Sequence, residues 1–201
     1  MVSLQSQTIR CRSLSRLALI SCLALTPLLQ GCALALAGGA AGATMVAMDA
    51  RDVGTQVDDN NLRVRIQTQL SEHETLAEQR VLIVVYNSNV LVYGQAADQA
   101  RREQAVRLVR GVNGVNRVYD QLRIGAPVTF AQRSRDTLLT SRVKTALLAD
   151  RDFDHSNIKI YTEAGEVFLV GRSSREAATD AIEKARHVSG VERVIDVIER
   201  L

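Results

Sequence analysis

The chain of 201 residues contains no tryptophan, and aromatic residues make up only 3% of it. So small an aromatic content argues against the stacked platforms that bind bases or sugars. The three cysteines, Cys11, Cys22 and Cys32, all lie near the N-terminus. The residues after Cys32 therefore contain no cysteine for a disulfide framework or a cysteine metal site.

The chain also lacks a real excess of basic charge. Its formal net charge is +3, but Arg10, Arg12 and Arg16 are the only charged residues before Cys32. The rest of the chain has 22 basic and 22 acidic residues. A dedicated nucleic-acid binder carries a basic excess, so we expect no nucleic acid among the partners.

Patterns typical of catalysis and metal binding are missing as well. The sequence has no serine elbow, phosphate loop or paired-carboxylate motif. His73, His155 and His187 stand singly and are interpreted as exposed polar residues. Asp150–Asp154 imitates the start of a calcium loop, but His155 and Tyr161 stand where that loop needs glycine and glutamate. We therefore expect no enzyme activity, no cofactor and no metal site.

The N-terminus has the pattern of a bacterial secretion signal. The three arginines precede an apolar stretch, Leu17–Leu29, which ends in Leu29-Gln30-Gly31-Cys32. This ending resembles a lipobox, whose cysteine is acylated and becomes the first residue of the mature protein. We predict a signal peptide at residues 1–31, acylation of Cys32 and a lipidated tether at residues 32–57. A transmembrane anchor is the alternative, but the Ala/Gly-rich continuation to Met48 suits a flexible tether better.

One pattern occurs twice in the rest of the chain. Val90–Val118 and Val167–Val194 each read as an apolar strand, a glycine, a helix and the motif G-V-x-x-V. An offset of 77 residues, which slips to 76 near the end, relates Asp59 to Asp136 and Gly94 to Gly171. We therefore predict two tandem domains, at residues 58–125 and 135–201, joined by a linker at residues 126–134.

Each copy is predicted to be a small α+β sandwich, with the order α-β-β-α-β and a three-stranded mixed sheet. Leu62, Ile66 and Leu70 give the first helix its buried face, and Asp58 or Asp59 is a candidate N-cap. In the second copy Asp136 takes the place of Asp59. Domains of about 65 residues are marginal alone, so we expect a fixed interface between the copies, through their sheets or their helices.

Both copies resemble the BON domain, a module of bacterial periplasmic proteins. The segments VLVYG with VNGVNRV, and VFLVG with VSGVERV, carry the resemblance. Two such copies after a lipobox and the segment VGTQVDD resemble the outer-membrane lipoproteins of this family. The resemblance implies an α-β-β-α-β fold, no catalysis and binding to phospholipid membranes.

For lipoproteins with two BON domains, the resemblance further implies that the second domain recognises anionic phospholipid. It also implies a role in envelope integrity near division sites. Ala33 stands after the lipobox cysteine where family experience would put aspartate for retention at the inner membrane. This implies the outer membrane, with the protein facing the periplasm.

The first helix of the second copy, predicted over Asp136–Ala149, differs from its counterpart in the first copy. Leu138 replaces Asn61 and lies on a polar, basic face, apart from the apolar core stripe of the helix. The predicted phospholipid-binding residues are Arg135, Leu138, Ser141, Arg142 and Thr145. The alternative is that Leu138 packs against the first domain or the linker.

The predicted function is that of a non-catalytic, monomeric lipoprotein that binds an anionic phospholipid membrane. The alternative is an adaptor that contacts envelope proteins in cell-wall amidase regulation or outer-membrane assembly. Such an adaptor would use its sheets or the basic helix that carries Arg101, Arg102, Arg107 and Arg110. If binding to liposomes did not depend on the charge of the lipid, the adaptor function would be favoured.

Overall fold

The computed structural model describes residues 51–149, 154–155 and 157–201 of the chain. Residues 49–201 form one compact unit. The predictions for the signal peptide, for Cys32 and for most of the tether concern residues outside the described part. Within that part, no helix is both long enough and apolar enough to cross a bilayer.

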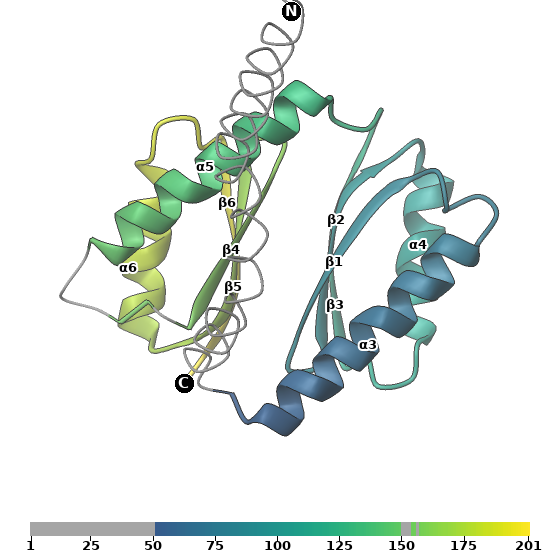
Figure 1. Ribbon diagram of the computed structural model, residues 1–201, viewed down its shortest axis with the longest axis horizontal. Coiled ribbons are helices and arrows are strands. Elements are labelled where there is room, and N and C mark those ends of the chain that lie inside the picture. Colours follow the sequence, from purple (N-terminus) through teal and green to yellow (C-terminus); the bar gives the residue numbers. More distant parts are fainter. Residues whose placement is uncertain (1–50, 150–153, 156) are drawn as a thin grey trace, which may run out of the picture. The chain divides into compact units, whose positions relative to one another are not determined.

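Two copies of the same five elements follow one another, in the predicted order. The first copy consists of α3 Val53–Glu72, β1 Arg80–Tyr86, β2 Asn89–Ala96, α4 Gln99–Gly111 and β3 Arg117–Ile124. The second copy consists of α5 Phe130–Leu148, β4 Ile158–Glu163, β5 Glu166–Ser173, α6 Arg175–Arg186 and β6 Arg193–Arg200. In each copy the two helices cover one face of a three-stranded sheet (Figure 1).

The middle strand of each sheet pairs antiparallel with one neighbour and parallel with the other. In the first copy β2 pairs antiparallel with β1 and parallel with β3, and β5 repeats this arrangement with β4 and β6. The α+β fold class with two mixed sheets is therefore confirmed. Gly94 and Gly171 occupy matching positions where a side chain does not fit, because a Cβ would lie 2.1 Å from Arg80 O and 2.0 Å from Asn157 O.

Both first helices begin earlier than the sequence predicted. α3 begins at Val53 with Asp52 as its N-cap, and α5 begins at Phe130 with Thr129 as its N-cap. Residues 53–57 of the predicted tether and residues 130–134 of the predicted linker are therefore helical. The polar composition of these segments and Pro127 favoured loops, but the cap residues determine where the helices start.

Asp59 and Asp136 do not cap their helices, and the prediction that they do is wrong. Asp59 is buried, and its carboxylate accepts hydrogen bonds from the backbone N–H groups of Asn87 and Ser88, both at 2.8 Å. Asp136 is also buried and accepts the two amides of the equivalent turn at 2.9 and 3.0 Å. Each aspartate thus fixes the hairpin of its own sheet to its own first helix, a long-range contact that no local pattern reveals.

The predicted core stripes are buried. Leu62, Ile66 and Leu70 of α3 pack between the first sheet and α4. Leu139, Val143 and Leu147 take the same place in the second copy. Each copy therefore has its own hydrophobic core between its sheet and its helices.

A third apolar cluster joins the two copies through their sheets. It consists of Val84, Tyr86, Leu91, Tyr93, Phe168 and Val170. The rings of Tyr93 and Phe168 lie 4.9 Å apart between centroids, and burial raises the pKa of the Tyr93 phenol. The expected interface between the copies thus forms through the sheets, a choice that the sequence left open.

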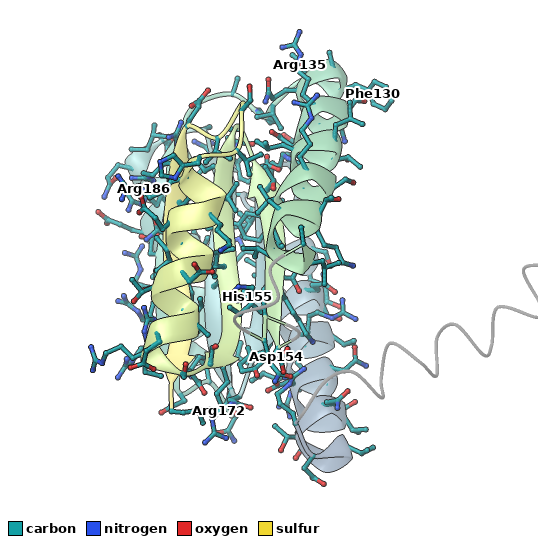
Figure 2. The ribbon with its side chains drawn as sticks, turned by 90° about the vertical axis from the view of Figure 1, so that its left-hand side faces the viewer. Phe130, Arg135, Asp154, His155, Arg172 and Arg186 are labelled. Atoms are coloured by element: carbon teal, nitrogen blue, oxygen red, sulfur yellow. The ribbon has the colours of Figure 1, made fainter. Side chains whose placement is uncertain are left out.

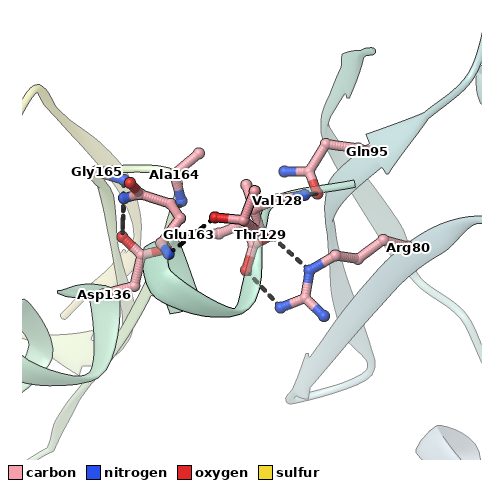
Figure 3. A network of polar contacts seen from close by, with 9 residues as sticks. Arg80, Gln95, Val128, Thr129, Asp136, Glu163, Ala164 and Gly165 are labelled. Carbon is pink, nitrogen blue, oxygen red and sulfur yellow. Dashed lines mark hydrogen bonds and ion pairs between the residues drawn. The ribbon is translucent and has the colours of Figure 1, made fainter. Parts of the chain in front are cut away.

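Polar side chains hold the edges of this interface. Arg80 of β1 makes a two-pronged ion pair with Glu163 of β4, with N···O distances of 2.7 and 2.8 Å (Figure 3). Arg123 Nη2 lies 2.6 Å from Glu166 Oε1, which is buried. The Asn87 amide donates to Glu199 at 2.8 Å. The buried carboxylates of Glu163 and Glu166 are thus each paired with an arginine of the first copy. Such pairing is needed because an unpaired charge is costly to bury.

His155 is not the exposed polar residue that the sequence predicted. Its side chain is only 2% exposed, and its Nε2 lies 3.1 Å from Asp180 Oδ2. Asp180 also pairs with Lys184 at 3.0 Å. The histidine therefore belongs to a polar contact between the segment after α5 and helix α6, which its isolated position in the sequence did not indicate.

Candidate functional site

Helix α5 buries one apolar face in the core and exposes a mainly polar, basic face that also carries large apolar side chains. The face with Leu139, Val143 and Leu147 is buried. We call the exposed positions of the helix the outer face of α5. They are Phe130, Ala131, Arg133, Ser134, Arg135, Thr137, Leu138, Ser141, Arg142, Lys144, Thr145 and Leu148.

The structure brings four of the five predicted binding residues together. Leu138, Ser141, Arg142 and Thr145 line one open groove with Ala146, Ala149 and, from the loop after α6, Val188. Leu138 is 60% exposed, so the alternative that it packs against the first domain or the linker is wrong. Among the described residues, every one that lines the groove belongs to the second copy.

Arg135, the fifth predicted residue, does not line the groove. It is exposed and lies three residues before Leu138, towards the N-terminal end of α5. Figure 2 shows Arg135 and Phe130 at this end of the helix, where they project to different sides of it. The predicted residues therefore share one helix and its outer face, but not one pocket.

The charge of the outer face is uncompensated. Helix α5 carries Arg133, Arg135, Arg142 and Lys144 against the single carboxylate of Asp136, a net charge of +3. Asp136 is buried and binds the hairpin turn. Within the described part of the chain, none of the four cations forms an ion pair, so their charge is available to an external anion.

The other basic helices use most of their charge internally. On α4, Arg101 pairs with Asp98, while Arg102 lies 3.0 Å from Asp120 and Arg107 lies 3.4 Å from Glu103. On α6, Lys184 and Arg186 also pair with carboxylates. The outer face of α5 is therefore the strongest candidate for an anionic partner.

The hydroxyl groups of the outer face are satisfied within the helix. Ser141 donates to Thr137 O at 3.1 Å, and Thr145 donates to Ser141 O at 2.9 Å. A hydroxyl that already donates loses less when water is removed than one that does not. The groove therefore combines an apolar wall, one guanidinium and hydroxyls that tolerate a less polar environment.

Sequence reasoning missed two large side chains of this face. Phe130 is 76% exposed and Leu148 is 66% exposed. Phe130 was assigned to the linker, although Thr129-Phe130-Ala131-Gln132 has the spacing of a capping box. Gln132 N indeed donates to Thr129 Oγ1 at 3.2 Å. Recognising that cap would have placed Phe130 on the helix.

The geometry favours an extended anionic surface over a small enclosed ligand. The groove is open to solvent and runs along the helix rather than into the domain. Among the residues that the structure describes, no three histidine, cysteine, aspartate or glutamate side chains gather closely enough to hold a metal ion. An apolar residue flanked by unpaired cations is typical of sites that bind the surface of an anionic membrane.

Known proteins are similar to this chain over most of its length. A chain from Haemophilus influenzae named outer membrane lipoprotein DolP is 39% identical over 94% of this chain and 97% of its own. A 21 kDa hemolysin from Actinobacillus pleuropneumoniae is 41% identical over 75% of this chain and 78% of its own. Osmotically-inducible protein Y of Escherichia coli is 30% identical over 71% of this chain and 72% of its own.

The family model of the BON domain matches the chain twice, at residues 58–126 and 135–200. These two ranges contain both sheets, and each begins within the first helix of its copy. The repeat, the fold and the identity to a relative that matches nearly the whole chain all agree with this match. The chain belongs to the BON-domain family and carries two copies of the domain.

Proposed function

We propose that this protein is a non-catalytic lipoprotein of the outer membrane that faces the periplasm and binds anionic phospholipid through the outer face of α5. One observation carries the proposal. All four cations of α5 lack an ion pair within the described part of the chain, and the exposed Leu138 lies among them. The only carboxylate of α5, that of Asp136, points inwards and binds the hairpin turn of the sheet.

The expected binding energy suits weak and reversible docking. Each basic residue close to an anionic membrane surface contributes about 1 kcal/mol. Burying one leucine side chain contributes about 1.5–3 kcal/mol. Acylation of Cys32 would hold the domain near the same membrane and raise its effective concentration there. The anchor and the outer face of α5 together supply the two signals that stable membrane attachment needs.

The location follows from the lipobox and from the relative that matches nearly the whole chain. That relative is named an outer membrane lipoprotein, and residue 33 of this chain is alanine. We infer the same location here. In keeping with the family resemblance, the docked protein supports envelope integrity, with division sites as its expected place of action.

The adaptor function has less structural support. The sheets, which were one of its expected contact surfaces, pack against each other through the Tyr93 and Phe168 cluster. The arginines of α4, which were the other, mostly pair with neighbouring carboxylates. No observation on the described residues favours a protein partner over a membrane.

A flotation assay tests the proposal with the mature chain that lacks only the acylated cysteine, residues 33–201. We expect this protein to float with vesicles that contain phosphatidylglycerol and to stay behind with pure phosphatidylcholine. Leu138→Glu places a negative charge at the centre of the outer face, so flotation should be lost while the circular dichroism spectrum is unchanged. The matched control is Asn61→Glu on α3, which should float like the wild type. Unaltered flotation of Leu138→Glu would exclude this site.

A further inference from the structure

Three large apolar side chains lie within one sector of about 80° on the outer face of α5. Phe130, Leu138 and Leu148 are 76%, 60% and 66% exposed. A helix turns by about 100° per residue, so Phe130 and Leu148 point in the same direction and Leu138 lies about 80° away. At a rise of about 1.5 Å per residue, the three span about 27 Å. They form an apolar ridge over the whole length of the helix.

The positions between these side chains carry satisfied hydroxyls. Ser134 donates to Phe130 O at 3.1 Å, which repeats the pattern of Ser141 and Thr145 further along the helix. Unpaired cations flank the ridge on both sides. Lys144 lies on one side and Arg142 on the other, at helical angles about 160° apart. A surface with apolar residues along its crest and cations on both flanks fits a membrane that lies parallel to the helix axis.

The N-terminal end of the ridge has the features of an interfacial anchor. The Arg133 guanidinium lies 5.7 Å from the centre of the Phe130 ring, as in a cation–π pair. Helices that lie in the membrane interface carry Trp, Phe or Leu on their apolar side and Lys or Arg on their polar side. Phe130 therefore gives the N-terminal end of α5 a large exposed apolar side chain next to a cation.

One hydrogen bond to the first domain and two within α5 and its cap hold this end of the helix in place. The side-chain oxygen of Gln95, a buried residue of β2, accepts the Val128 N–H at 3.3 Å. Thr129 then caps the helix, and Gln132 Nε2 donates to Asp136 Oδ1 at 3.0 Å. Phe130 thus begins a fixed helical turn and not a loose linker.

We propose that α5 lies flat on an anionic glycerophospholipid bilayer, with Phe130 inserted at its N-terminal end and Leu148 at its C-terminal end. This inference rests on the proposed function and extends it to the orientation of the domain. If docking used only the groove around Leu138 and Val188, the helix would tilt and Phe130 would remain in water.

Single-cysteine labelling distinguishes the two orientations. Residues 33–201 contain no cysteine, so one introduced cysteine carries the label alone. An environment-sensitive fluorophore is attached to Phe130→Cys, Leu138→Cys or Leu148→Cys. Controls carry it at the α3 positions 77 residues earlier, as Val53→Cys, Asn61→Cys and Ser71→Cys. Vesicles of phosphatidylglycerol and phosphatidylcholine are the probe, with nitroxide-bearing lipid as a quencher.

We expect blue-shifted emission and quenching at all three α5 positions, and neither change at the α3 positions. In the unlabelled protein, Phe130→Ala should weaken vesicle binding about tenfold, since a large apolar side chain loses its burial, while Val53→Ala should leave binding unchanged. A response at 138 and 148 without one at 130 would overturn the flat orientation but not the proposed function. No response at any α5 position would overturn both.

Discussion

The first helices of the two copies, α3 and α5, are alike on the side that faces the protein. Both bury three aliphatic residues at the same spacing against a sheet of the same topology. Both place a buried aspartate, Asp59 or Asp136, on the amides of a hairpin turn. The inner faces therefore meet the same folding requirement twice.

The sides that face solvent differ in charge and in size. Helix α3 carries two arginines against three carboxylates, a net charge of −1, whereas the net charge of α5 is +3. Phe130, Leu138 and Leu148 of α5 stand where α3 has Val53, Asn61 and Ser71. These differences lie at exposed positions, where the fold does not restrict the residue type. A binding function present in only one of the two copies is expected at such positions.

One of the residue types that the two helices share makes different contacts in each helix. Arg65 of α3 donates to Asn113 O at 3.2 Å, in the loop after α4. Arg142, its equivalent in α5, makes no such bond within the described part and lines the open groove instead. The two arginines therefore have different roles. The bond to Asn113 O occupies the guanidinium of Arg65, whereas the guanidinium of Arg142 can bind an external anion.

Exchanging the outer face should have the largest effect on binding. Six positions of α5 are changed to their α3 equivalents: Phe130→Val, Arg133→Gln, Arg135→Asp, Leu138→Asn, Lys144→Gln and Leu148→Ser. The loss of apolar insertion and of three cations should weaken binding to phosphatidylglycerol vesicles at least about a hundredfold, as measured by flotation or titration.

The control for this exchange changes three exposed valines of α3 to serine: Val53→Ser, Val57→Ser and Val64→Ser. Vesicle binding of this variant should equal that of the wild type. If vesicle binding of this α3 variant fell as far as that of the six-position α5 variant, the difference between the two helices would have no role in binding.

The aspartates should show the opposite behaviour, because they belong to the shared inner face. Asp59→Ala and Asp136→Ala each leave two hairpin amides without their acceptor, which should lower the free energy of unfolding by about 2–4 kcal/mol in either copy. Urea denaturation measures this loss. Similar values for the two variants support a common structural device, while a loss in only one copy would contradict it.

The smallest expected effect on vesicle binding is that of replacing Arg142, in comparison with its α3 equivalent Arg65. Arg142→Gln removes one available cation, so binding to anionic vesicles at low salt should fall about fivefold with unchanged thermal stability. Arg65→Gln should leave vesicle binding unchanged and lower stability by about 1 kcal/mol, because it loses the bond to Asn113 O. Equal effects of the two variants on binding would argue against a site confined to α5.

The repeat pattern predicted the element order, the core stripes and the exposed position of Leu138. These features depend on local periodicity, which the sequence records directly. The roles of Asp59 and Asp136 could not be predicted, because their partners lie 28 residues or more away in the chain. The N-terminal end of α5 was missed because Pro127 favoured a linker, although Thr129 and Gln132 carried the signal for a helix start.

The sequence required an interface between the copies but did not identify its surfaces. Small domains need additional burial, and either sheets or helices would have supplied it. Tyr93 and Phe168 determine the outcome, since both lie on the sheet faces turned away from the helices and their burial needs the partner sheet. This use of the sheets leaves the outer faces of the helices available for binding.

The most direct test of the α5 assignment is backbone amide chemical-shift mapping of residues 33–201 with bicelles that contain phosphatidylglycerol. We predict perturbations along the outer face of α5 and at the loop around Val188, with the matching positions of α3 unchanged. Bicelles without anionic lipid should produce no perturbation. Perturbation of α3 to the same extent, or none on α5, would contradict the assignment of lipid binding to the second copy.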